Sequence, residues 1–229
     1  MSSIREVLWE AIRGEEKQYT TGSIRRAIVL LSIPMILEMA MESLFAIVDV
    51  FFVSRIGVEA VTTVGLTESV ITIVYSLAWG VAMAATAMVS RRIGENKPEE
   101  AARAAVQSIV LALILGLVLG ISGFIFAGDI LRLMGADETV VQSGITYTRI
   151  SFASNVIILL LFLLNGIFRG AGDAAIAMYS LWIANAVNIV LDPLLIFGIG
   201  PFPEMGVTGA AVATSIGRSV GIVFQLYIL

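Results

Sequence analysis

Six long apolar runs follow one another along the chain, separated by short polar segments. The runs cover residues 27–53, 64–88, 101–126, 143–168, 174–197 and 206–229. Each is at least as long as the roughly 20 residues that an α-helix needs to cross the hydrocarbon core of a bilayer. The pattern predicts an all-α integral membrane protein with a bundle of six transmembrane helices, which we place in residues 23–229.

The first 22 residues show a different pattern, in which apolar side chains recur at helical spacing on one face. These side chains are Ile4, Val7, Leu8, Ala11 and Ile12. The spacing predicts a short amphipathic helix over residues 4–12, either lying on the membrane surface or packed against the bundle. A polar connector completes this N-terminal segment, residues 1–22, which we expect on the cytoplasmic side.

Composition agrees with a membrane protein and narrows the chemistry. Hydrophobic residues make up 58% of the chain and charged residues 14%, whereas a soluble domain carries about 25% charged residues. The chain has no cysteine and no histidine, so any proton that it handles must be held by carboxylates. It shows no phosphate-binding loop and no nucleophile–base pair, and its basic and aromatic residues do not interleave. We therefore expect neither an enzyme nor a nucleic-acid partner.

The distribution of basic residues predicts the orientation. Ten of the fourteen Lys and Arg residues lie in the N-terminal arm, the 91–103 loop and the turn at 169. Because basic residues gather on the cytoplasmic side of a membrane protein, six spans place both termini in the cytoplasm. We expect a multi-pass protein of the inner (plasma) membrane.

Four carboxylates interrupt the apolar runs. Glu38, Glu42 and Asp49 lie in the first run, and Asp192 lies in the fifth. A charged group at the bilayer centre costs about 2.5–3.5 kcal/mol even on the lenient insertion scale. At 100° per residue, the three acids of the first run fall within about 40° of one another on a helix. Such a stripe is expected to face the interior of the bundle.

Asp49 and Asp192 are expected at a similar depth, close to the outer ends of their helices. Amides and hydroxyls predicted beside them are Asn185, Asn188, Thr208 and Thr214. Together these groups predict a site for a coupling ion, either H⁺ or Na⁺, with the two aspartates as metal ligands if the ion is Na⁺. No other cofactor is expected. The alternative is a purely structural hydrogen-bond network between helices.

The candidate substrate cavity lies deeper in the bundle. Its predicted lining residues are Glu38, Glu42, Tyr147 and Asn155. Acidic side chains there would attract a cationic substrate. Alternatively, one of the two glutamates neutralises Arg218, which falls inside the sixth run, or faces a second lobe. Glu68 is placed close to the outer end of the second helix and interpreted as an interfacial residue.

Four segments together resemble the multidrug and toxic compound extrusion (MATE) family. They are VDVFFVSRIG at 48–57, VSRRIG at 89–94, FRGAGD at 168–173 and GVTGAAVAT at 206–214. The resemblance implies export of a small amphipathic, often cationic, compound in exchange for H⁺ or Na⁺. It also makes Asp49 the acid of the N-terminal lobe, with Asn188 and Asp192 as its partners.

The family fold that this resemblance implies has two six-helix lobes, and the chain corresponds to the N-terminal one. A second lobe is therefore an expected partner, beside the lipid bilayer, and it would come from a missing C-terminal half or from homodimerisation. Two other functions stay open at this point. One is a flippase of lipid-linked precursors with related architecture, and the other is a non-transporting assembly subunit of a membrane complex.

Overall fold

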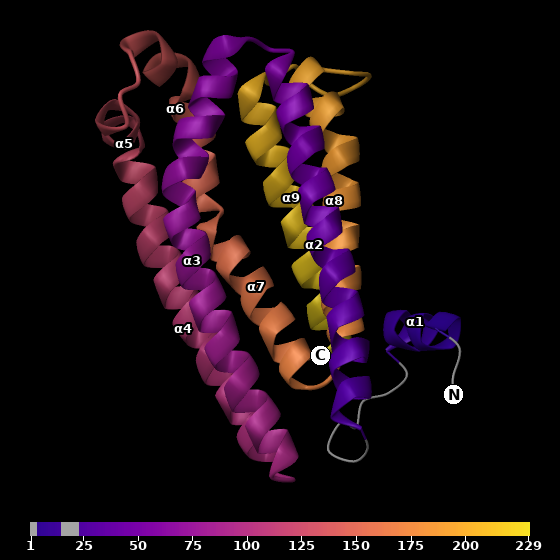
Figure 1. Cartoon of the computed structure of the whole chain (residues 1–229). Helices are drawn as coiled ribbons and strands as arrows, with labels where there is room; N and C mark the ends of the chain where they lie inside the picture. The colour runs from indigo at the N-terminus through magenta and orange to yellow at the C-terminus, as the bar shows by residue number, and fades with distance from the viewer. Residues whose placement is uncertain (1–3, 15–22) are drawn as a thin grey trace.

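The computed structural model describes residues 4–14 and 23–229, and every regular element within them is a helix (Figure 1). The helices are α1 (Ile4–Arg13), α2 (Ile24–Ser54), α3 (Val58–Gly94), α4 (Pro98–Ile125), α5 (Ala127–Leu133), α6 (Glu138–Ala153), α7 (Asn155–Gly170), α8 (Ala174–Phe197) and α9 (Val207–Ile228). The all-helical prediction is confirmed. The boundary between residues 1–22 and 23–229 stays a prediction, because residues 15–22 lie outside the described part.

Five stretches of the described helices are long and apolar enough to cross a membrane. They are α3, α4, α8, α9 and the stretch Glu138–Gly170, which contains both α6 and α7. The first predicted run corresponds to α2, which is not one of the five. With 31 residues, α2 is about 46 Å long at 1.5 Å per residue, and its crossing of the membrane stays a prediction.

The predicted span over 143–168 lies within one candidate membrane span, Glu138–Gly170, which is interrupted at one residue. The helix is broken at Ser154, between the end of α6 and the start of α7. The Ser154 hydroxyl contacts the carbonyl oxygen of Ile150 at 2.8 Å and the hydroxyl of Ser215 at 2.5 Å. Side-chain hydroxyls that bond to the preceding turn often bend helices, and Ser151, Ser154 and Asn155 are polar residues at this place in the apolar run.

The helices run up and down between two ends of the bundle (Figure 1). We call the end where α2 turns into α3 the outer end, following the predicted orientation, and the opposite end the inner end. The connection between α8 and α9 also lies at the outer end, whereas the turns from α3 to α4 and from α7 to α8 lie at the inner end. In the core, α8 packs against α9 and α2, while α3 packs against α4, α6 and α7.

Helix α7 occupies the centre of the lobe. Leu159, Leu161, Leu163 and Leu164 are almost completely buried and form one core with apolar residues of α3, α4, α8 and α9. In contrast, the apolar windows of α3 and α4 are only 28% and 22% buried. Large exposed apolar surfaces are rare in soluble monomers, and here they lie on helices long enough to meet lipid.

Helix α1 lies across the bundle beside the inner part of α2 (Figure 1). The Tyr179 hydroxyl of α8 donates to the carbonyl oxygen of Ile12 at 2.9 Å, and Arg26 pairs with Glu10 at 2.6 Å. Ala11 is buried against the bundle, while Trp9 is exposed. The predicted helix is confirmed, and it is packed against the bundle with part of its apolar surface uncovered.

Candidate functional site: an acidic cavity between the helices

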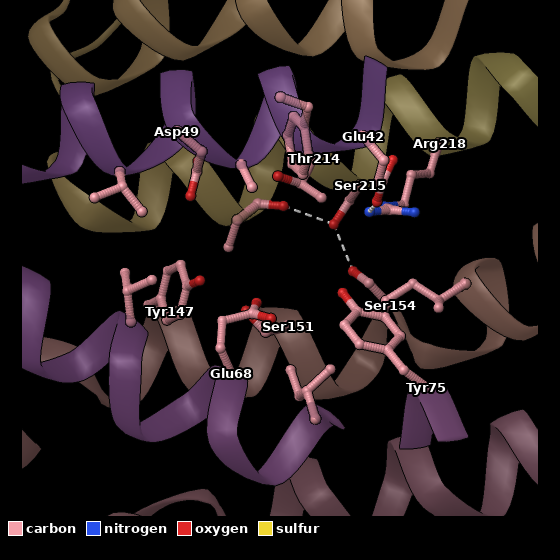
Figure 2. Close-up of a pocket in the computed structure, with 17 residues that line it drawn as sticks. Glu42, Asp49, Glu68, Tyr75, Tyr147, Ser151, Ser154, Thr214, Ser215 and Arg218 are labelled. Carbon is pink, nitrogen blue, oxygen red and sulfur yellow. Dashed lines mark hydrogen bonds and ion pairs between the residues drawn. The ribbon is translucent and has the colours of Figure 1, made fainter. Parts of the chain in front are cut away.

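A cavity of about 230 Å³ lies between α2, α3, α6, α7 and α9 (Figure 2). Its walls mix apolar side chains with charged and hydroxyl groups. The polar lining residues are Glu42, Asp49, Glu68, Tyr75, Tyr147, Ser151, Ser154, Thr214, Ser215 and Arg218. An apolar pocket with a few convergent polar groups is the usual form of a small-molecule site.

Asp49 and Glu68 approach the cavity from opposite walls. Figure 2 shows Asp49 on α2 and Glu68 on α3, with both carboxylates directed into the space between the two helices. Glu68 accepts no hydrogen bond from any residue within the described ranges. The Oδ1 atom of Asp49 is buried and likewise has no partner there. Both acids therefore keep oxygen atoms for a ligand.

Glu68 was missed as a site residue, and the reason lies in the length of its helix. The apolar run begins at residue 64, but α3 begins six residues earlier, at Val58. Glu68 is therefore ten residues into the helix, a depth of about 15 Å. The spacing of Val64, Glu68, Ile71 and Tyr75, which share the cavity face, was the signal that could have identified it.

Asp192 lies behind the cavity wall, in a cluster with Asn188 and Thr214. It is completely buried. The Asn188 side-chain amide donates to Asp192 Oδ1 at 3.4 Å and to Thr214 Oγ1 at 3.0 Å. Asp192 is also close enough to Asp49 for the two charges to repel each other. We call Asp49, Asn188, Asp192 and Thr214 the aspartate cluster.

Three oxygen atoms of the aspartate cluster stay without a protein partner among the described residues. They are Asp49 Oδ1, Asn188 Oδ1 and Asp192 Oδ2. Buried polar atoms are normally hydrogen-bonded. No three acidic side chains in the part of the chain that the structure describes are close enough to hold a metal ion by themselves. A cation here would have to combine carboxylate with amide and hydroxyl oxygens.

Arg218 closes the inner end of the cavity. Its Nη2 atom lies 2.9 Å from Glu42 Oε1, and its side chain is 4% exposed. The Asn185 side-chain amide donates to the other carboxylate oxygen of Glu42 at 3.1 Å. Of the alternatives left open by the sequence, neutralisation of Arg218 is therefore realised, by Glu42. Glu42 also lines the cavity.

Glu38 lies one helical turn further in and does not line the cavity. It forms an ion pair with Arg169 at 2.5 Å and accepts a hydrogen bond from Asn165 at 3.3 Å. Gln225 of α9 donates in turn to Asn165. We call Glu38, Asn165, Arg169 and Gln225 the inner cluster. It ties α2 to α7 and α9.

The structure thus brings together most, but not all, of the predicted residues. Tyr147 lines the cavity as expected, and Thr214, which was predicted for the ion site, lines the cavity and accepts a hydrogen bond from Asn188. Asn155 is completely buried outside the cavity lining, and neither of its side-chain polar atoms has a partner among the described residues. Thr208 lies one residue into α9, also outside the lining. Glu38 and Asn155 therefore do not line the cavity as predicted, whereas the role of Thr208 at the ion site stays a prediction.

Comparison with known proteins places these features in a family. The sequence model of the MatE family matches residues 34–194. The FAD transporter of Shewanella oneidensis is 32% identical over 91% of this chain and 46% of its own length. The probable multidrug resistance protein YoeA of Bacillus subtilis is 30% identical over 85% of this chain and 42% of its own length.

Solved structures give the same result for the fold. A MOP superfamily transporter from Pyrococcus furiosus matches with a TM-score of 0.83 and 35% identity, over 99% of this chain and 47% of that one. The outward-facing conformation of a multidrug resistance MATE family transporter of the MOP superfamily matches with the same values. The chain spans about half the length of the relatives that it matches, and it resembles one lobe of a two-lobe transporter.

Proposed function

Because this chain belongs to the MATE family of multidrug efflux transporters, we propose that it is one half of an antiporter that exports amphipathic cations. The exchanged ion is H⁺ or Na⁺. The observation that carries this proposal is the charge of the cavity wall, which holds three carboxylates and one guanidinium. Since Arg218 is paired with Glu42, the acids Asp49 and Glu68 are left to attract a cation.

The aspartate cluster is the proposed site of the coupling ion. Two carboxylates that repel each other in a buried place are stabilised by a proton held on one of them, or by a cation between them. A Na⁺ ion would take oxygen ligands from Asp49 and Asp192, supplemented by Asn188 and Thr214, since hard cations prefer oxygen donors. Because Asp49 is on α2 and Asp192 is on α8, loading the site would change how these two helices attract each other.

The proposal also covers the orientation of the chain in the membrane and the origin of a second lobe. The chain is a multi-pass membrane protein, and the bias of Lys and Arg residues supports an inner (plasma) membrane with both termini in the cytoplasm. The second lobe would come from a continuation of the chain or from a second copy. The substrate would lie between the two lobes.

Anionic cargo is the alternative that the wall charges disfavour. One relative is a transporter of FAD, which carries phosphate groups, and a flippase of lipid-linked precursors would also have to accept phosphate. Such cargo is expected to need cations that are free to bind it. The one arginine in the cavity wall is paired with Glu42 through Nη2, so its charge is balanced, while its Nε and Nη1 atoms have no partner among the described residues.

The test is gradient-driven export of ethidium from vesicles that contain the full two-lobe protein. We expect Asp49→Asn and Asp192→Asn each to abolish export driven by an imposed H⁺ or Na⁺ gradient, while the protein still inserts and folds. Glu59→Gln is the matched control, because Glu59 is exposed on α3. Full gradient-driven export in both aspartate variants would refute the proposal, and the gradient that drives export identifies the ion.

A further inference from the structure

The two free carboxylates of the cavity lie in different surroundings. Asp49 belongs to the aspartate cluster, with Asp192 close behind it. Glu68 faces the cavity from a wall that also contains Ile71, Tyr75 and Tyr147. One acid is thus surrounded by groups that hold a small ion, and the other by apolar and aromatic groups.

The wall around Glu68 has a fixed shape. The ring of Tyr75 packs edge-on against Phe162 of α7, with ring centroids 6.1 Å apart, and this contact fixes the orientation of the tyrosine beside the cavity. Tyr147 is 5% exposed. Aromatic rings attract organic cations through their negative faces, and rigid rings do so at a low cost in conformational entropy.

From these surroundings we infer that Glu68 is the residue that selects the charge of the cargo. The cationic group of the exported compound binds at the Glu68 carboxylate, with its apolar body against Ile71 and Tyr75, while the aspartate cluster binds the exchanged ion. This inference rests on the proposed function and assigns separate residues to the two cations.

The size of the cavity supports the assignment of the cargo and the exchanged ion to separate residues. A volume of about 230 Å³ is below the roughly 300–1,000 Å³ of sites that enclose a whole drug-sized ligand. The cavity therefore accommodates the charged head of an amphipathic compound, and the remainder extends beyond this lobe.

Equilibrium binding of ethidium to the full protein in detergent, without a gradient, tests the inference. A hydrogen-bonded contact with a charged group contributes about 1.5–3 kcal/mol, which corresponds to a loss of roughly tenfold to a hundredfold in affinity. We expect this loss for Glu68→Gln and a smaller one for Glu68→Asp, which keeps the charge. Glu59→Gln on the same helix, which is exposed outside the cavity lining, should bind as the unchanged protein does, whereas Asp49→Asn, which removes one of the two acids of the wall, should lose less than tenfold.

The outcomes separate this inference from the proposed function. Ethidium binding within twofold of the unchanged protein in a correctly folded Glu68→Gln variant would overturn the role of Glu68, even if gradient-driven export persists. Loss of binding in that variant, together with export by the unchanged protein that responds to neither gradient, would support the role of Glu68 and refute ion coupling. A tenfold loss in Asp49→Asn as well would overturn the separation of the two sites. Folding is checked for each variant by its elution as a single species.

Discussion

Removing the charge of Glu38 should destabilise the lobe strongly, although Glu38 lies outside the cavity. Its carboxylate is paired with Arg169 in the inner cluster, and the two side chains are 8% and 13% exposed. Glu38→Gln leaves the arginine charge without a counterion in a place with little access to water. The inner cluster also connects α2 with α7 and α9, so its loss affects three helices.

The magnitude follows from the burial of both partners. Removing one partner of a buried ion pair costs about 3–5 kcal/mol, whereas replacing both partners is often nearly neutral. We place Glu38→Gln near the lower limit, at about 3 kcal/mol, because the new amide oxygen still accepts a hydrogen bond from Arg169. The double variant Glu38→Gln/Arg169→Gln should regain about 2 kcal/mol relative to Glu38→Gln alone, because neither charge is then left without a counterion.

Equilibrium unfolding in mixed micelles measures these free energies for the two single variants and the double variant. Glu100→Gln is the matched control, because Glu100 of α4 pairs with Arg92 of α3 at the surface, with side chains 45% and 37% exposed. An exposed pair contributes about 0–1 kcal/mol. The reasoning would be refuted by a loss below about 1 kcal/mol for Glu38→Gln, or by a double variant that is less stable than either single variant.

Two further predictions concern helix packing and a helix end. A Cβ atom at Gly217 would lie 2.5 Å from the carbonyl oxygen of Ala184, so Gly217→Ala should separate α8 from α9 and cost about 1–3 kcal/mol in the same unfolding assay. Gly65→Ala, where no atom lies within 4 Å of the added Cβ, is its control, and an equal loss at both positions would contradict the packing argument. A threonine hydroxyl and then backbone N–H groups donate to the Asp137 carboxylate at the start of α6 and hold its pKa below its usual value. The resulting stabilisation is present above the ordinary aspartate range and is lost as the pH falls through the lowered pKa. The protection of the first turn of α6 against hydrogen exchange, relative to the intrinsic exchange rate at each pH, should therefore no longer fall in acid in Asp137→Ala. A fall equal to that of the unchanged protein would show that this carboxylate is not its cause.

The sequence alone was sufficient for the all-helical architecture and for the polar face of α2. Backbone groups in a bilayer must be hydrogen-bonded within the protein, so a long apolar run has few alternatives to a helix. The similar depth of Asp49 and Asp192 could be predicted because their distances from the helix ends can be counted along the chain, and their shared role stays a prediction. The position of a residue along a helix axis and the face on which it lies both follow from its spacing in the sequence.

The predicted depth of a residue in the membrane was wrong where a helix extended beyond its apolar run. Glu68 was assigned to the interface because hydropathy marks the start of the run at residue 64, whereas α3 starts at Val58. Polar residues that form the first turns of a long helix are not distinguished from a loop by hydropathy. The interruption at Ser154 was not predicted, although Ser154 and Asn155 are adjacent polar residues, because polar residues also occur inside continuous membrane helices.

Only the tertiary structure decided which acid meets which base. Glu38 and Glu42 are one turn apart on the same face of α2, and the sequence offered both as partners of Arg218. The structure pairs Glu42 with Arg218 and Glu38 with Arg169. Such pairings depend on the axial shift and rotation of helices that are far apart in the chain. Those two quantities are fixed by side-chain packing at glycine contacts and in the α7 core, and a count of residues along one helix contains no information about them.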